Sequence, residues 1–176
     1  MKISAILKTD ILNNINAILE DWLDKYLDLD ITCRADTDFY LYYNDENDEH
    51  GIAWSTFQSE ADTQRFKIFI KEALAVDVDQ CHPWLLSFFH EVGHEMTMDN
   101  FSDEELEEDR NQRNAIAAEE DPDYFTYFNL PVEKAATEWG VNFIIQNQDL
   151  VTDLLYDVME QIALFYGAND IEYEED

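Results

Sequence analysis

The chain has 176 residues, of which 46% are hydrophobic and 14% aromatic, and its formal net charge is −31 at pH 7. This apolar content excludes a disordered chain and is sufficient for a hydrophobic core. The negative charge excludes direct binding to nucleic acid or to an anionic membrane, and it favours cations and basic protein surfaces as partners.

Cysteine usage and hydropathy predict a cytoplasmic protein. The two cysteines, Cys33 and Cys81, are too few for a disulfide framework, so we expect free thiols. No run approaches the ~20 apolar residues of a membrane-spanning helix. The apolar run near Met1 is too short for a signal peptide, so we expect neither export nor insertion in a membrane.

The N-terminal part is predicted to form a helix followed by strands. Apolar residues recur at helical spacing from Ile11 to Tyr26. From Ile31 the period shifts toward two, which is typical of strands. The predicted strands are residues 39–43, 52–57 and 65–70. A sheet edge such as the third strand is a candidate to hold an extended peptide by backbone pairing.

The strongest motif of the chain is His90-Glu91-Val92-Gly93-His94. Pro83 suits the first turn of a helix here, and the apolar run after it predicts that the helix is buried. Two histidines four positions apart on a helix share a face, with Cβ atoms ~5–6 Å apart, so both can bind one metal ion. Glu91 can then accept a proton from a metal-activated water. The alternative is that both histidines are structural and pair with nearby carboxylates.

An acidic segment, residues 99–123, follows the motif. Ser102-Asp103-Glu104-Glu105 is a capping box, which predicts a helix start. The segment has few apolar residues, so we expect a mostly solvated helix or a mobile flap. The aromatic residues of 124–128 are expected to pack into the core beneath it, with a binding patch as the alternative.

A third metal ligand is expected on the next helix, because a catalytic zinc site has three protein ligands and keeps its fourth position for water. Pro131 suits the first turn of that helix. Glu133 is the predicted ligand, and Thr137 lies one helical turn after it. Glu138 is the competing candidate, although it lies at a different angle on the helix. A final helix is predicted from about Leu150 to Gly167.

These elements together predict an α+β fold that is rich in helix. We expect a single domain over residues 1–176, with an acidic tail from about residue 168. In this fold a small sheet of about three strands packs on the HExxH helix.

The two motif segments, 90–94 and 131–140, resemble the ImmA/IrrE type of small zinc metallopeptidase. These proteins belong to the wider gluzincin-like group of zincins. They pair a H-E-x-G-H helix with a later Glu-x-x-Ala-Asn/Asp helix whose glutamate completes the zinc site. The likeness covers roughly residues 52 to 147 and implies a zincin-like domain.

The resemblance also implies the chemistry of the site. It assigns Zn²⁺ as the cofactor, His90, His94 and Glu133 as its ligands, and Glu91 as the general base. Thr137 stands where an Asn or Asp is usual in the family. This departure predicts that the hydrogen bond orienting a ligand histidine is weakened or absent.

Two functions of different classes follow from the sequence. In the first, the protein is a zinc metallopeptidase that hydrolyses peptide bonds of a peptide or protein substrate through a metal-activated water. In the second, it is an acidic mimic of nucleic acid, because dense carboxylates can imitate the phosphate array of a duplex. The partner would then be a basic nucleic-acid-binding protein, such as a restriction or CRISPR effector. Solubility or salt adaptation is a third explanation of the charge.

Overall fold

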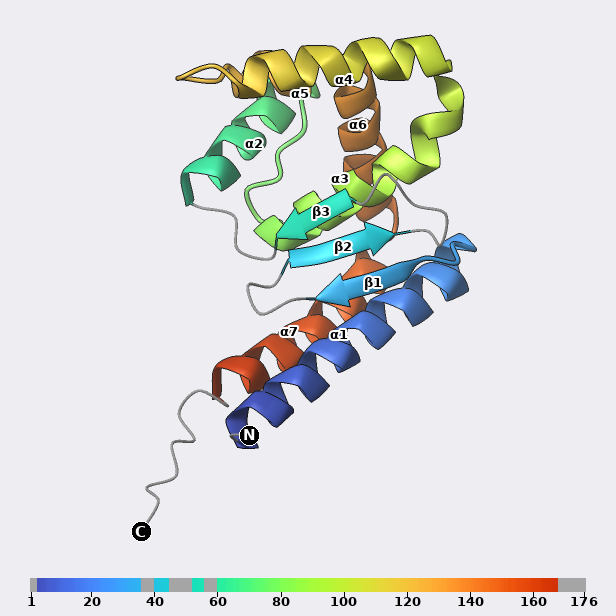
Figure 1. The fold of residues 1–176 in the computed structure, drawn as a ribbon, viewed down its shortest axis with the longest axis vertical. Coiled ribbons are helices and arrows are strands. Elements are labelled where there is room, and N and C mark those ends of the chain that lie inside the picture. Colours follow the sequence, from blue (N-terminus) through green and yellow to red (C-terminus); the bar gives the residue numbers. More distant parts are fainter. Residues whose placement is uncertain (1–2, 36–39, 45–51, 56–59, 168–176) are drawn as a thin grey trace. The chain divides into compact units, whose positions relative to one another are not determined.

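The computed structural model describes residues 3–35, 40–44, 52–55 and 60–167 (Figure 1). Its helices are α1 (Ile3–Leu27), α2 (Glu60–Ala73), α3 (Pro83–Thr97), the 3-10 helix η1 (Met98–Asn100), α4 (Asp103–Ala117), α5 (Tyr124–Phe128), α6 (Pro131–Gln146) and α7 (Gln148–Gly167). Short strands are β1 (Thr32–Ala35), β2 (Tyr40–Asn44) and β3 (Ile52–Ser55). The chain forms two compact units: Met1–Thr56 with Gln148–Asp176, and Phe57–Asn147.

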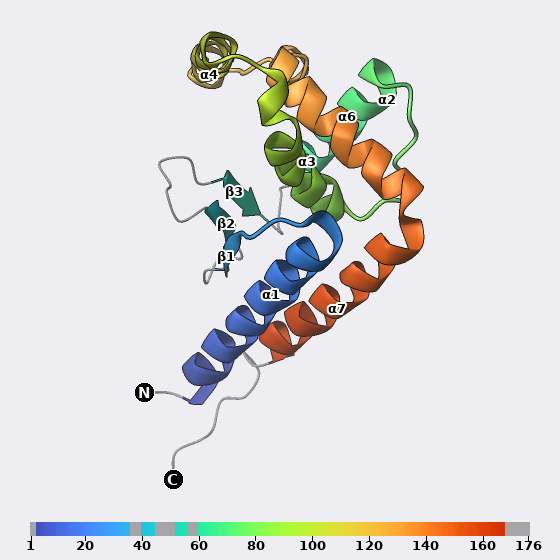
Figure 2. The ribbon, with the colours of Figure 1, turned by 90° about the vertical axis from the view of Figure 1, so that its right-hand side faces the viewer.

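The first unit is built on the helix pair α1 and α7, which run alongside each other (Figure 2). Each helix turns an apolar stripe to the unit's core, as helical spacing of the apolar residues requires. Buried residues of this pair include Leu12, Ile15, Leu19, Leu23, Val151, Leu154, Val158, Ile162 and Phe165. The strands are antiparallel in the order β1-β2-β3. Strand β1 is attached to α1, where the Cys33 N–H donates to Glu20 Oε1 at 2.7 Å.

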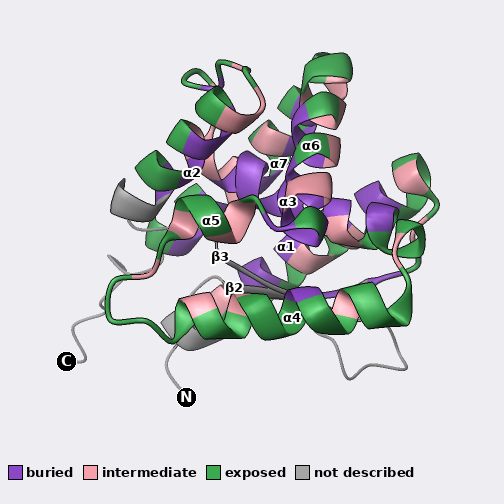
Figure 3. Ribbon diagram, turned by 90° about the horizontal axis from the view of Figure 1, so that it is seen from above, coloured by how far each residue is buried: buried purple, intermediate pink, exposed green. Residues whose placement is uncertain are grey.

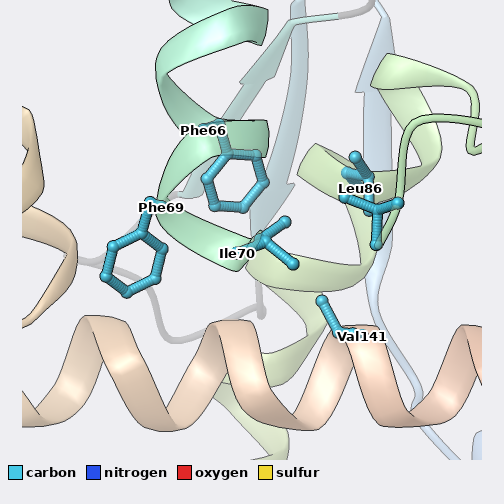
Figure 4. Packing of buried hydrophobic residues seen from close by; sticks show 6 residues of the cluster. Phe66, Phe69, Ile70, Leu86 and Val141 are labelled. Atoms are coloured by element: carbon cyan, nitrogen blue, oxygen red, sulfur yellow. The ribbon is translucent and has the colours of Figure 1, made fainter. Parts of the chain in front are cut away.

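The second unit contains α2 to α6 and is organised around the contact between α3 and α6. Helix α3 is buried along most of its length, above all on the N-terminal side of the motif. A neighbouring cluster joins α2 to these helices through Phe66, Phe69, Ile70, Val78, Leu86 and Val141 (Figure 4). This packing fixes α3, and therefore the motif, in the core of the unit.

Two glycines allow α3 and α6 to cross closely. A Cβ atom at Gly93 would lie 2.3 Å from the carbonyl oxygen of Ala136, and one at Gly140 would lie 2.5 Å from that of Phe89. The obstacle in each case is the backbone of the opposite helix, so no side-chain rotation could relieve it. The crossing brings the face of α3 that carries the motif histidines against the first turns of α6.

The predicted α+β fold, with a sheet of about three strands packed on the HExxH helix, is wrong. All regular structure in two described ranges, residues 7–31 and 63–167, is helical, and neither range contains a strand. The short strands belong to the unit of α1 and α7, whereas α3 belongs to the other. The structure is therefore that of a helix-rich protein whose motif helix packs on a helix, α6. The single zincin-like domain over residues 1–176 stays a prediction, and the tail from 168 lies outside the described residues.

The third predicted strand, residues 65–70, is part of helix α2. A strand would place Phe66, Ile68 and Ile70 on one face, because its side chains alternate. In the structure Phe66, Phe69 and Ile70 are buried, whereas Ile68 is 50% exposed. That is the i, i+3, i+4 pattern of a helix, and six residues of alternating sequence were too few to distinguish the two periods.

Helix boundaries follow the predicted signals more closely. Pro83 and Pro131 lie in the first turns of α3 and α6, and α7 is helical up to Gly167, the last residue described there. The Ser102 side chain accepts from the Glu105 N–H while Glu105 bonds back to the Ser102 N–H, so α4 begins with the predicted capping box. Figure 3 shows α4 exposed along most of its length, as expected for the solvated acidic helix. Within the described residues no helix is long and apolar enough to cross a membrane.

Candidate metal centre

Three potential metal ligands meet where α3 crosses α6. His90 and His94 come from α3 and Glu133 from the first turn of α6, and one donor atom of each lies within 4.8 Å of the others. His90 Nε2 is 3.2 Å from Glu133 Oε2, and His94 Nε2 is 3.4 Å from Glu133 Oε1. The competing candidate, Glu138, is exposed on α6 and is not part of this group.

The distances between the donor atoms suit a tetrahedral ion. Two ligands that are each 2.0–2.1 Å from a tetrahedrally coordinated zinc ion are about 3.3–3.4 Å apart. The His90–carboxylate separation, 3.2 Å to Oε2, and the His94–carboxylate separation, 3.4 Å to Oε1, are both close to this value, each to a different oxygen of Glu133. The residues present therefore fit a His₂Glu metal site in both donor type and spacing.

Thr137 sets the orientation of His90. The Thr137 hydroxyl donates to the carbonyl oxygen of Glu133 at 2.9 Å, and its oxygen lies 2.9 Å from His90 Nδ1. A hydroxyl has a single proton, so here it accepts from the Nδ1–H of His90. The lone pair of His90 is then on Nε2, the atom that faces Glu133. The bond, predicted to be weakened or absent, is present, because a threonine one turn after Glu133 reaches the imidazole.

An electron-rich contact at the centre calls for a cation. With a lone pair on His90 Nε2, that atom and Glu133 Oε2 would repel each other at 3.2 Å unless a proton or a metal ion lay between them. Burial alone would lower the pKa of His90, but the hydrogen bond to Glu133 and the negative charges of Glu91 and Glu133 raise it. Burial alone would raise the pKa of Glu133, but its hydrogen bonds to His90 and His94 hold it well below its usual range. The site is thus built to hold positive charge.

Glu91 has the electrostatics of a proton acceptor rather than of a ligand. It is half-buried beside His90 on α3 and is not among the three converging donors. Burial raises its pKa, and the charges of His90 and His94 oppose that effect without cancelling it. A carboxylate with a raised pKa is a stronger base, which favours proton acceptance by a general base.

Two charged residues of the centre were missed in the sequence. The Arg113 guanidinium Nη1 is 2.9 Å from Glu133 Oε1, and its Nε is 2.8 Å from Asp109 Oδ2. Both come from α4, the acidic helix that was expected to be solvated. Their i, i+4 spacing in the sequence predicts that Asp109 and Arg113 pair on one face of a helix. Arg113 is also one of only two basic residues in this segment, with Arg110.

Aromatic side chains enclose His90 on the side away from α6. The rings of Phe66 and Phe128 lie edge-on to its imidazole, with centroids 5.6 and 6.1 Å away. Phe128 also contacts Phe66 and Phe69, at 4.8 and 5.4 Å between centroids. Phe128 is half-buried and packs against the core cluster, so the predicted core packing of this segment holds only in part. Phe125, however, is 42% exposed.

Tyr127 adds a polar group to the same region. Its side chain hydrogen-bonds to Arg113, and burial together with the charge of Glu133 raises its pKa to about 12. The phenol therefore stays protonated at all physiological pH values. His82 caps α3 by accepting from the Trp84 N–H at 3.4 Å.

Comparisons with protein-family models, with curated proteins and with solved structures found no match to this chain.

Proposed function

We propose that the protein is a zinc-dependent metallopeptidase-like hydrolase, with His90, His94 and Glu133 holding the ion and Glu91 acting as general base. One observation carries the proposal. Two imidazole Nε2 atoms and a buried carboxylate converge at tetrahedral ligand spacing, 3.2 and 3.4 Å, beside a carboxyl group whose pKa is raised.

The roles of the residues follow from their positions. Bound zinc supplies Lewis acidity and an activated water in such sites. Thr137 holds the Nδ1–H of His90 and so directs the Nε2 lone pair toward the centre. Glu91 accepts a proton and returns it to the leaving amine, which its raised pKa favours. Phe66 and Phe128 exclude water behind His90.

The substrate class proposed is a peptide or protein. This follows from the resemblance of the motif helix and the glutamate helix to ImmA/IrrE-type peptidases, which is itself part of the proposal. The segment 65–70 plays no part in substrate pairing, because it lies in helix α2. A cytoplasmic location is included in the proposal, since Cys33 and Cys81 are both free thiols.

A single pair of variants tests the role of Glu91. Glu91→Gln should abolish hydrolysis of a casein-type unfolded substrate by the zinc-loaded protein while leaving its zinc content unchanged, since Glu91 is not a ligand. Glu95→Gln, an exposed position one turn along the same helix, is the matched control and should retain activity. Loss of zinc from Glu91→Gln, or full activity in that variant, would contradict the assignment.

We also propose, as the second candidate, an acidic mimic of nucleic acid that binds a basic protein. The observation that favours it is the outer face of α4, where Glu104, Glu107 and Glu108 are exposed and line one shallow depression. The other predicted contributors, 45–49 and 170–176, lie outside the described residues. Binding to a basic nucleic-acid-binding protein should then weaken steeply with salt. Reversal of the three glutamates to Lys should remove it, and Glu91→Gln should leave it intact; the opposite pattern rejects the mimic.

A further inference from the structure

Arg113 connects the acidic helix α4 to the metal centre. Its Nη1 atom lies 2.9 Å from Glu133 Oε1, and the other oxygen of that carboxylate, Oε2, faces His90 Nε2 at 3.2 Å. One carboxylate is therefore shared between a guanidinium on one side and an imidazole on the other. None of the roles described above requires this arrangement.

The guanidinium is itself held in place by Asp109. Asp109 Oδ2 lies 2.8 Å from Arg113 Nε, and Asp109 Oδ1 accepts the Val132 N–H at 3.1 Å. Val132 precedes Glu133 in the first turn of α6. The contacts thus form a closed path from α4 to the backbone of α6 and back through the Glu133 side chain.

This path is the main buried attachment of α4. Asp109 is the single buried residue of that helix, and its neighbours on the outer face are exposed. A helix fixed through a polar residue, instead of an apolar stripe, indicates that the polar contact matters for more than packing. Two buried carboxylates beside one guanidinium would be costly to leave unpaired.

Arginine suits this position better than lysine. The guanidinium carries its nitrogens on one rigid plane, so it forms ion pairs with Asp109 through Nε and with Glu133 through Nη1 at once, although Nε, Asp109 Oδ2 and Glu133 Oε1 lack an aligned hydrogen bond. An ammonium group is a point charge on a flexible stem and could satisfy one carboxylate well but not fix both. The ion pair therefore favours the rotation of the Glu133 carboxylate that keeps Oε1 beside the guanidinium.

We propose that Arg113 is a positioning residue of the metal centre, which holds the Glu133 carboxylate so that Oε2 is directed toward His90 and Oε1 toward His94. Asp109 supports it by fixing the guanidinium. The inference rests on the proposed function, because it takes His90, His94 and Glu133 to be the ligands. A positioning role and a simple charge effect predict opposite changes in zinc affinity when Arg113 is removed. A cation that only repelled zinc would weaken binding, and its removal would then strengthen it.

The test is the zinc dissociation constant of the full chain, measured by competition with a chelator. Removing the partner that orients a metal ligand typically lowers metal affinity about 10–100-fold, and this loss is expected for Arg113→Met. Arg113→Lys should recover part of the affinity, and Asp109→Asn should lose less than Arg113→Met. Arg110→Met removes the same charge from an exposed position of α4 and should leave the affinity unchanged.

A second readout separates positioning from stability. The visible absorption of the Co²⁺-substituted protein reports ligand geometry, and it should change in Arg113→Met and return toward wild type in Arg113→Lys. If Arg113→Met fails to fold, Asp109→Asn and Arg113→Lys decide the matter, because each keeps a cation beside Glu133. Unchanged or tighter zinc binding in the folded Arg113 variants would overturn the inference and leave the metal site standing. Failure of the wild-type chain to bind zinc would instead reject the proposed function.

Discussion

Replacing Gly93 by alanine should destabilise the protein and weaken its metal site together. The new Cβ atom would lie 2.3 Å from the Ala136 carbonyl oxygen, about 1.1 Å short of the 3.4 Å at which ordinary contact begins. Overpacking typically costs about 1–3 kcal/mol, and alanine regains about 1 kcal/mol over glycine in a helix. Because the obstacle is backbone, the cost should reach the upper end of that range or beyond. A net loss of about 2 kcal/mol is expected, or roughly 4–8 °C in Tm for a chain of this size.

Thermal and urea unfolding of Gly93→Ala, with zinc affinity measured on the same samples, tests this expectation. Gly167→Ala is the control, because a Cβ there meets nothing within 4 Å, and it should be neutral or slightly stabilising. Zinc affinity should fall in Gly93→Ala alone, because separating the helices by about 1 Å moves both histidines away from Glu133. A Gly93→Ala protein as stable as Gly167→Ala, with unchanged zinc affinity, would refute the close crossing of α3 and α6.

Three further expectations concern packing, orientation and pH. Phe69 is fully buried and Ile68 half exposed. Phe69→Ala should therefore cost about 3–5 kcal/mol in unfolding free energy, and Ile68→Ala under about 1 kcal/mol. Similar losses in the two variants would favour a strand over helix α2. Thr137→Val removes the hydroxyl bonded to His90 Nδ1 and should lower zinc affinity about 10–100-fold, so an unchanged dissociation constant would show that the bond does not orient the imidazole. The folded-state pKa of Glu133 is depressed below the ordinary 4.5, so its contribution to stability is present above that pH and lost as pH falls toward the lower folded value. Chelator-treated wild type should therefore lose more unfolding free energy below pH 4.5 than Glu133→Gln, and parallel pH profiles would contradict this.

The sequence was most informative where local signals act alone. The two prolines, the Ser102 capping box and Gly167 each predicted a helix end, because such ends are set by a few neighbouring residues. The motif predicted that His90 and His94 share a face, since four residues are about one helical turn. These features need no knowledge of the rest of the chain.

What depends on packing between distant segments was not predicted. The alternation in residues 65–70 predicts a third strand, whereas the packing of Phe69 against Phe128 of α5 selects a helix there. Arg113 was read as part of a solvated acidic helix. Its contact with Glu133 spans two helices, and no local pattern indicates which basic residue of α4 turns inward. Thr137 was undervalued for a similar reason, because its reach to His90 depends on how closely α3 and α6 approach.

The zinc content of the purified protein tests the central claim most directly. After reconstitution and removal of loosely held metal, wild type should carry one zinc ion per chain by elemental analysis. Glu133→Ala should lose it, because it removes a ligand from the buried site, whereas Glu138→Ala, which changes an exposed carboxylate on the same helix, should retain it. A wild-type chain that binds no zinc, or a Glu133→Ala chain that keeps its full content, would contradict the metal centre described here.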